Sequence, residues 1–289
     1  MPLCLYRTAS TGVARLGLIE NDRVTDVGAA GGPSTLTDAL SMPLATLRQQ
    51  LDAVHQRSAP AQNLGEIHLA APVDRQEVWA AGVTYLRSRD ARMEESTQKD
   101  VYDRVYDADR PELFLKATPN RVSGPGEQIA IRGDSTWDVP EPELALIINR
   151  DGDIAGYTVG NDVSSRSIEG ENPLYLPQAK MYTACAAVGP VIALAWEIER
   201  PDNLAIALTI RRAGAVHFED TTSTSQIHRP IPELVSYLRR HNEFPHGVIL
   251  MTGTGIIPPP EFTLEDGDQV DITIDSIGTL SNPVVRLSS

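Results

Sequence analysis

Three acidic side chains in the middle of the chain form the strongest chemical pattern in the sequence. Glu141 and Glu143 are two residues apart, and Pro142 between them favours extended backbone, so both carboxylates would point to one face of a strand. Asp151–Gly152 is the signal of a tight two-residue hairpin turn. Such a hairpin would place Asp162 directly opposite Glu141 and would gather the three carboxylates on one face.

Three carboxylates on one face repel one another unless a cation lies among them. Hard oxygen ligands without a neighbouring His or Cys suit Mg²⁺, Mn²⁺ or Ca²⁺ better than zinc. The sequence therefore predicts a divalent-metal site at Glu141, Glu143 and Asp162. The alternative is a solvated acidic strand edge, and a bulge in the hairpin would break the register.

The residues that follow this hairpin have side chains suited to a negatively charged ligand. Ser164, Ser165 and Arg166 come at the end of its second strand, and an arginine can pair bidentately with a carboxylate. Thr252 and Thr254 flank a glycine at the end of another strand, where hydroxyl and backbone N–H groups commonly hold an oxyanion. We take these five as candidate substrate-binding residues. Ordinary turns held by serine or glycine are the alternatives.

Lys180 is a candidate general base. It precedes an apolar stretch, residues 181–187, and would be partly desolvated there. Desolvation together with a nearby metal cation would lower its pKa towards neutrality, where the amine can accept a proton. A lysine that keeps its ammonium group in water is the alternative.

The elements that must position these residues divide the chain into two parts. Residues 1–70 combine short strand-like stretches with leucines at helical spacing, which predicts a small N-terminal α/β domain. Pro43 interrupts the leucine pattern, so we expect a helix break there, with Ser41 capping the second half. Residues 71–289 contain many strand-like runs separated by turn signals, which predicts a β-rich catalytic domain. The fold class is therefore mixed α+β.

Residues 89–108 form a densely charged stretch with little apolar content. The simplest interpretation is a solvated helix with charge pairs four residues apart. The alternative is a mobile lid over a site, because a helix with little apolar surface has low local stability.

Composition narrows the class of protein. The 289 residues carry a formal net charge of −14, which disfavours nucleic-acid binding, and 41% of them are hydrophobic, which is enough for a large core. The two cysteines, Cys4 and Cys185, favour a reducing compartment. The sequence shows no pattern of a secretory signal or of a membrane span of about 20 apolar residues. We therefore expect a cytoplasmic protein with a small-molecule partner and with no membrane or nucleic-acid partner.

Taken together, the motifs resemble those of the fumarylacetoacetate hydrolase superfamily. The matching pieces are E-x-E at 141–143, G-N-D-V-S-x-R at 160–166, Lys180 and T-G-T at 252–254, and the resemblance extends over residues 77–285. It implies a twisted mixed β-roll core and a homodimer or homotetramer. It also implies Mg²⁺ or Mn²⁺ held by the two glutamates and the aspartate.

One stretch departs from the hydrolytic members of the superfamily. Those members carry G-x-N-Y-x-x-H-x-x-E, whose His and Glu activate water, whereas this chain has Ser88 and Ala91 at the two positions. The variant G-V-T-Y-L-R-S-R at 82–89, with R-P-E-L-F-L-K at 110–116, resembles instead the branch of 2-keto-3-deoxy-sugar-acid dehydratases. C–C bond hydrolysis by activated water is therefore disfavoured.

This branch implies dehydration of a 2-keto-3-deoxy-pentonate to 2-oxoglutarate semialdehyde. A metal on the 2-oxo acid would stabilise an enolate, Lys180 would remove the C3 proton, and Glu112 would protonate the leaving C4 hydroxyl. Arg87, Ser88 and Arg89 would hold the substrate. The alternatives are an acylpyruvate or fumarylacetoacetate-type hydrolase, a 2-oxo-dioate decarboxylase with the same metal centre, and a non-catalytic Ca²⁺-binding protein.

Overall fold

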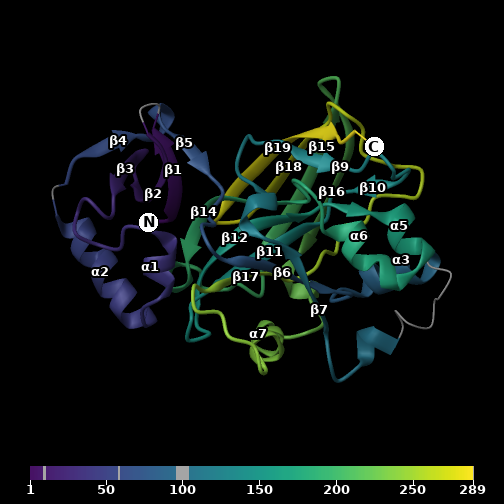
Figure 1. Ribbon diagram of the computed structural model, residues 1–289, viewed down its shortest axis with the longest axis horizontal. Helices are drawn as coiled ribbons and strands as arrows, with labels where there is room; N and C mark the ends of the chain where they lie inside the picture. The colour runs from purple at the N-terminus through teal and green to yellow at the C-terminus, as the bar shows by residue number, and fades with distance from the viewer. Residues whose placement is uncertain (9–10, 58, 96–103, 289) are drawn as a thin grey trace.

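The computed structural model describes residues 1–289 apart from 9–10, 58, 96–103 and 289. Two sheets dominate it (Figure 1). A twelve-stranded sheet has the order β4-β3-β2-β1-β14-β12-β11-β17-β6-β7, with β5 beside β1 and β8 beside β14. A five-stranded sheet has the order β16-β15-β18-β19-β9, and β10 and β13 form a separate pair.

The leading part of the chain contributes five strands and two helices. They are β1 (Leu3–Thr8), β2 (Thr11–Glu20), β3 (Arg23–Asp26), α1 (Leu36–Leu40), α2 (Leu44–Gln56), β4 (Ala61–Asn63) and β5 (His68–Ala70). The expected break at Pro43 separates α1 from α2. The role predicted for Ser41 is wrong, because its hydroxyl donates to the Thr37 carbonyl oxygen at the end of α1, over 2.6 Å.

The rest of the chain supplies the other strands and helices. In the large sheet they are β6 (Glu77–Gly82), β7 (Glu112–Ala117), β8 (Val122–Ser123), β11 (Pro142–Ile148), β12 (Ile154–Asp162), β14 (Ala186–Leu194) and β17 (Val248–Met251). The other strands are β9 (Ile129–Ile131), β10 (Asp138–Val139), β13 (Ser164–Ser165), β15 (Ala205–Arg212), β16 (Ala215–Ser223), β18 (Gln269–Ile274) and β19 (Gly278–Arg286). The helices are α3 (Leu86–Glu95), α5 (Arg166–Glu171), α6 (Leu176–Lys180) and α7 (Ile231–Arg239).

The large sheet runs through both parts of the chain. β1 pairs with β14 through Leu3 and Ile192, so the leading part extends the sheet of the remainder. The division into domains at residue 70 stays a prediction. In Figure 1 the leading strands and α1–α2 lie at one end of the molecule, and α3, α5 and α6 gather at the other.

β11 lies at the centre of the core and is buried on both faces. Leu144, Leu146 and Ile148 pack in a cluster with residues of β15 and β18, whereas Ala145 and Ile147 pack in a cluster with the leucines of α1 and α2. A strand covered on both sides reads as a continuous apolar run, which is why residues 144–148 show no polar alternation. This packing fixes the strand that carries Glu143.

The hairpin of β11 and β12 has the predicted register but not the predicted turn. Glu143 is paired with Gly160, as expected. The turn is one residue longer than a two-residue turn, because the Asn149 N–H donates to the Asp153 carbonyl oxygen over 2.9 Å. A bulge between the pairs of Ile147 and Ile148 then restores the register. The two departures cancel before the acidic residues are reached.

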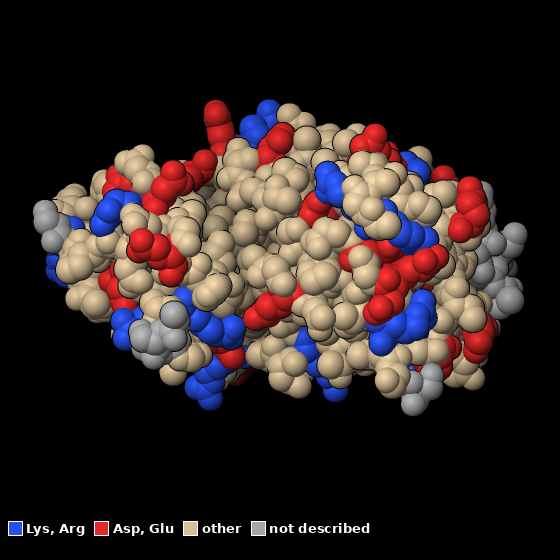
Figure 2. Space-filling view, turned by 90° about the horizontal axis from the view of Figure 1, so that it is seen from above, with Lys and Arg blue, Asp and Glu red and all other residues tan. Residues whose placement is uncertain are grey.

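The described helices include none that is long and apolar enough to cross a bilayer. Figure 2 shows acidic and basic side chains interspersed over one face of the molecule, without a continuous basic region on that face. This face therefore offers no extended surface of one charge for a phosphate backbone.

Candidate active site

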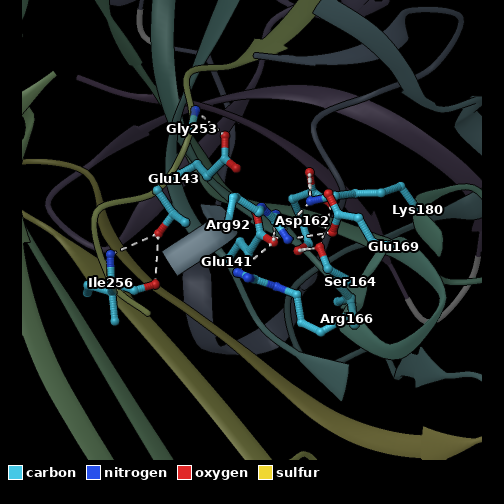
Figure 3. Close-up of polar contacts among 12 residues, drawn as sticks. Arg92, Glu141, Glu143, Asp162, Ser164, Arg166, Glu169, Lys180, Gly253 and Ile256 are labelled. Atoms are coloured by element: carbon cyan, nitrogen blue, oxygen red, sulfur yellow. Dashed lines mark hydrogen bonds and ion pairs between the residues drawn. The ribbon is translucent and has the colours of Figure 1, made fainter. Parts of the chain in front are cut away.

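The three predicted metal ligands converge. Ligand oxygens of Glu141, Glu143 and Asp162 all lie within 4.8 Å of one another, and all three side chains are buried. The Asp162 N–H donates to the Glu141 carbonyl oxygen over 3.0 Å, which is the predicted opposition of these two residues. The backbone N–H of Gly253 donates to Glu143 Oε2 over 2.5 Å (Figure 3). Backbone geometry therefore fixes the carboxylate cluster.

Crowding of like charges dominates the electrostatics of this cluster. Burial raises the pKa of Glu143 well above its usual value, and the negative charges of Asp162 and Glu141 raise it further. Burial also acts to raise the pKa of Glu141, but Lys180, Arg92 and Arg166 outweigh it and hold this pKa well below its usual value. A buried set of hard oxygen donors that resists full ionisation is a chemical fit for a divalent cation.

Four buried cations surround the carboxylates. Arg92, Arg166 and Lys180 approach the same atom, Glu141 Oε1, at 2.9, 3.2 and 3.0 Å (Figure 3). Lys180 Nζ also lies 3.2 Å from Asp162 Oδ2. Lys116 Nζ lies 2.7 Å from the other oxygen, Asp162 Oδ1.

The lowered pKa expected for Lys180 beside a metal ion stays a prediction, because the carboxylates alone shift this pKa in the opposite direction. Burial does act to lower this pKa, but the carboxylates of Asp162 and Glu141 raise it more, and the net shift is upward. The reason is distance, because both carboxylates are within hydrogen-bonding reach of the ammonium group. Lys180 is therefore an ammonium ion when it contacts the free carboxylates.

Glu112 can be protonated close to neutral pH. It begins β7, opposite Gly82 of β6, and burial raises its pKa to about 7, with a further contribution from Glu169. Arg92 and Lys180 oppose this shift only in part. The close approach needs the glycine, since a Cβ on Gly82 would lie 2.1 Å from Glu112 Oε2.

A small cavity joins these groups. Its lining residues are Ala81, Gly82, Val83, Ser88, Arg92, Glu112, Phe114, Glu141, Asp162, Glu169, Lys180, Gly253 and Thr254. The candidate base, the candidate acid and two of the three metal ligands thus face one space. Of the predicted substrate-binding residues, Ser88 and Thr254 also line it.

Other predicted substrate-binding residues have partners outside the cavity. Arg87 donates to Asp220 over 3.0 Å, and Arg89 donates to its neighbour Asp90. Thr252 Oγ1 donates to the Leu144 carbonyl oxygen over 2.9 Å. The structure therefore does not bring Arg87, Arg89 or the Thr252 hydroxyl to the cavity.

The predicted substrate-binding residues Ser164, Ser165 and Arg166 also contact protein groups. Ser165 Oγ caps α5 by accepting the Ile168 N–H, and it donates to Ser135 Oγ over 2.8 Å. Ser164 Oγ donates to the Asp162 carbonyl oxygen over 3.0 Å. Together with the contact of Arg166 to Glu141, these bonds hold the segment around the acidic residues in place.

Three charged residues of the site were not singled out in the sequence. Arg92 lies on α3, one turn after Ser88, and bonds Glu169 of α5 over 2.5 Å. It belongs to the stretch interpreted as a solvated helix or a lid, of which residues 96–103 lie outside the described part. The available signals were the four-residue spacing of Ser88 and Arg92 and, for Lys116, alternation with Glu112 on one strand. The inward face of α3 is polar.

The fold and this geometry agree with a known family. The family model of the fumarylacetoacetate (FAA) hydrolase C-terminal domain matches residues 77–285, well over half of the chain. The chain belongs to the fumarylacetoacetate hydrolase family. The predicted family and fold class, a β-rich α+β structure of this type, are thereby confirmed.

The similar proteins include dehydratases. A probable 2-keto-3-deoxyxylonate dehydratase of Haloferax volcanii is 57% identical over 220 residues, 76% of this chain and 76% of the relative. A 2-dehydro-3-deoxy-D-arabinonate dehydratase of Saccharolobus solfataricus is 49% identical over 227 residues, 77% of this chain and 76% of the relative. A solved 2-keto-3-deoxy-D-arabinonate dehydratase, in complex with magnesium and 2,5-dioxopentanoate, has a TM-score of 0.83 and 37% identity over the whole of both chains.

Proposed function

We propose that the protein is a metal-dependent hydro-lyase that converts a 2-keto-3-deoxy-pentonate into 2-oxoglutarate semialdehyde. The observation that carries this proposal is one cavity lined by candidate metal ligands, a lysine and a protonatable glutamate. The similarity to two sugar-acid dehydratases, at 57% and 49% identity, supports the same reaction class.

Glu141, Glu143 and Asp162 would hold the metal ion, Mg²⁺ or Mn²⁺. When bound, such an ion supplies a Lewis acid for the carboxylate and 2-oxo group of the substrate. The charges around the cavity are consistent with this occupancy. Five carboxyl groups (Glu112, Glu141, Glu143, Asp162 and Glu169) and four cations (Arg92, Lys116, Arg166 and Lys180) sum to −1 when all are ionised. A divalent cation with a monoanionic acid brings the sum to zero.

Lys180 and Glu112 are the residues that would move protons. Lys180, once its carboxylate partners are engaged elsewhere, would take the proton from C3. Glu112, whose pKa is about 7, would give a proton to the leaving C4 hydroxyl, so that the C4–O bond breaks and water departs. Transfer of a proton from C5 to C3 then gives an enol with its double bond between C4 and C5. Protonation of C4 and loss of the proton from the C5 hydroxyl convert this enol into the aldehyde.

The same geometry argues against a hydrolase. Hydrolysis of a C–C bond needs a group that activates water, and Ser88 and Ala91 stand where hydrolytic relatives would carry His and Glu. The lining of the cavity in the described part of the chain includes no histidine. Dehydration requires no water nucleophile, so these residues are compatible with it.

Assembly and cellular location complete the proposal. We expect a homodimer or homotetramer that acts in the cytoplasm on a free 2-oxo sugar acid. Sedimentation of the purified protein would measure the assembly, and a monomer at working concentration would contradict it. Ser88 and Thr254, which line the cavity, are the candidate contacts for the substrate.

A product assay tests the reaction. Purified protein with Mg²⁺ is incubated with 2-keto-3-deoxy-D-arabinonate, with its enantiomer at C4 and with an acylpyruvate, each with and without EDTA, and the products are followed by NMR. An EDTA-sensitive semialdehyde signal is the expected result, and the two enantiomers report the stereochemical preference. Pyruvate from the acylpyruvate, without any semialdehyde, would overturn the proposal in favour of a hydrolase.

A further inference from the structure

The use of lysine in this chain is unusual. Among 25 basic residues only Lys99, Lys116 and Lys180 are lysines, and the other 22 are arginines. Lys99 lies outside the described residues. The two described lysines, Lys116 and Lys180, are both buried and contact the two oxygens of the same carboxylate, Asp162. A chain that uses arginine elsewhere therefore places lysine on both sides of one candidate metal ligand.

Three oxygen atoms surround the Nζ of Lys116, two as hydrogen-bond acceptors and one as an ion-pair partner. Its Nζ lies 2.7 Å from Asp162 Oδ1, 2.8 Å from the Val163 carbonyl oxygen and 2.5 Å from the Lys180 carbonyl oxygen. Three donors on one nitrogen exist only in the ammonium form, and a planar guanidinium could not direct its donors to three acceptors around one point. Lys116 is therefore a fixed cation that has no donor left for a substrate.

Lys180 differs in the same terms. Its Nζ has two acceptors in the described part of the chain, Glu141 Oε1 and Asp162 Oδ2, and the side chain lines the cavity. One N–H bond is thus left over and the group is accessible to a ligand. Lys116 is surrounded by protein oxygen atoms, whereas Lys180 keeps an N–H group for a ligand. This difference suits Lys116 to a structural role and Lys180 to a role in proton transfer.

Strand β7 explains how Lys116 reaches the open lysine. Glu112 and Phe114 are two residues apart on β7 and share one face, and Lys116 follows at a β-bulge between Leu115 and Ala117. Lys180 Nζ lies 5.7 Å from the centre of the Phe114 ring, and the backbone carbonyl of Lys180 accepts from Lys116. Strand β7 therefore carries the candidate acid at its start and contacts the candidate base through Phe114 and Lys116.

We propose that Lys116 is a positioning residue, which ties the carboxylate of Asp162 to the backbone of Lys180 and so sets the base against the metal site. The assignment rests on the proposed function in one respect, that Lys180 is the base. Because Lys116 acts through two other residues, its loss should slow the chemical step more than it weakens substrate binding.

Kinetics at saturating Mg²⁺ tests this role. For Lys116→Met we expect kcat to fall about 100-fold with a change in KM below about threefold. For Lys116→Arg, which keeps the charge with altered donor geometry, we expect a kcat at least about tenfold above that of Lys116→Met. This variant also serves where Lys116→Met does not fold. A loss confined to KM, or an arginine variant as slow as the methionine one, would overturn the proposal.

Arg212→Met is the matched control. Arg212 is also a cation on a buried aspartate, since it bonds both oxygens of Asp268 at 2.8 Å and the Thr263 carbonyl oxygen at 2.9 Å. It lies outside the cavity, so its loss should lower the unfolding temperature while kcat stays within about threefold of the wild type. Equal losses of kcat in Arg212→Met and Lys116→Met would show that the loss in Lys116→Met comes from general destabilisation of the protein.

A spectroscopic readout separates failure of this proposal from failure of the proposed function. With lysine labelled at Cε with ¹³C, the chain gives three NMR signals, which Lys99→Arg and Lys116→Met assign by their loss. In the metal-free protein, Lys116→Met should shift the Lys180 signal by more than its linewidth, whereas Arg212→Met should not. An unmoved Lys180 signal would overturn the proposal even where the wild type produces semialdehyde. A shifted Lys180 signal in a protein without dehydratase activity would support the positioning role of Lys116 and contradict the proposed dehydration.

Discussion

Asp162 and Asp268 are both buried aspartates with close cationic partners, but only Asp162 belongs to the candidate site. Asp268, in the region of the five-stranded sheet, accepts two guanidinium N–H bonds from Arg212 at 2.8 Å and the backbone N–H of Glu265 at 2.9 Å. Asp162 has two lysines but also two further carboxylates within 4.8 Å. Among the described residues this is the one group of three that could hold a metal ion. Both aspartates are thus buried and paired with cations. What distinguishes the candidate site is that Asp162 also lies close to two other carboxylates, whose negative charges repel its own.

The comparison predicts the largest effect at Lys180. Lys180→Met keeps the length of the side chain but removes the base, so turnover should fall by about 1,000-fold or more while the protein stays folded and still binds Mg²⁺. Semialdehyde production followed by NMR measures the loss, and Mg²⁺ titration calorimetry measures the binding. A variant that keeps about a tenth of wild-type turnover would remove Lys180 from the chemistry.

Glu143→Gln sharpens the comparison, because it should act in opposite directions on stability and binding. Removing one of three crowded carboxylates relieves repulsion, so the metal-free protein should unfold at a temperature higher by about 2 °C or more. The affinity for Mg²⁺ should fall by about 10- to 100-fold, because a ligand charge is lost. Thermal unfolding with and without Mg²⁺ measures both changes.

Asp268→Asn is the matched control for this change. It removes the same charge from a carboxylate without crowded neighbours, so it should lower stability by about 1–3 kcal/mol and leave Mg²⁺ affinity unchanged. If Glu143→Gln and Asp268→Asn both raised or both lowered the stability, the proposed electrostatic difference between the two regions would be wrong.

The pH dependence of turnover tests the cavity through Glu112. Burial raises the pKa of this carboxyl to about 7, so the acid form is lost as the pH rises above that value, and kcat/KM should decline about tenfold per pH unit on the alkaline side. Glu112→Gln should lack this limb and be slower by about 10- to 100-fold. The profile is measured from pH 6 to 9 at saturating Mg²⁺.

Glu169→Gln identifies what sets that limb. The charge of Glu169 is the second cause of the raised pKa of Glu112, after burial, so its removal should move the limb to lower pH. An alkaline limb that neither Glu112→Gln nor Glu169→Gln changes would assign the titration to another group.

The sequence could predict the part of the site that depends on one hairpin. The opposition of Glu141 and Asp162 follows from the pairing register of the hairpin. The turn is one residue longer than predicted, but the bulge in β12 restores the predicted register, so the opposition is correct. Arg92 and Glu169 could not be found in this way, since their contact requires α3 to pack against α5, far apart in the chain.

The charged helix shows why composition misleads near a polar cavity. Amphipathic patterning identifies a helix face by its apolar residues, which assumes that the buried face meets an apolar core. Among the α3 residues whose side chains are described, Ser88 and Arg92 are the buried ones. Ser88 lines the cavity, and Arg92 bonds Glu169 and Glu141. A helix that covers a charged site therefore looks solvated in the sequence, and only the tertiary structure shows which face is buried.

The smallest predicted effect is on stability and concerns Asp138. Unlike Asp162 and Asp268, this buried carboxylate has no cation closer than Arg286 among the described residues. Burial raises its pKa to about 6, since Ser135 and Arg286, whose Nη1 lies 4.0 Å away, oppose the shift only in part. The folded chain therefore holds this proton more tightly than the unfolded chain. Its stabilising contribution is complete below about pH 3.8 and is lost as the pH rises through about 6, a difference of about 3 kcal/mol.

Asp138→Asn removes that dependence. At pH 8 the variant avoids the buried charge but leaves an amide in its place, which costs about 1–2 kcal/mol, so we expect a net gain of about 1 kcal/mol and an unfolding temperature higher by about 2–4 °C. At pH 4, where the wild-type carboxyl is largely protonated, mainly the cost of the amide remains, so the variant should be less stable than the wild type by about 1 kcal/mol. Thermal unfolding from pH 4 to 8 measures the difference, and curves that stay parallel for the two proteins would show that Asp138, like Asp268, is compensated in the fold.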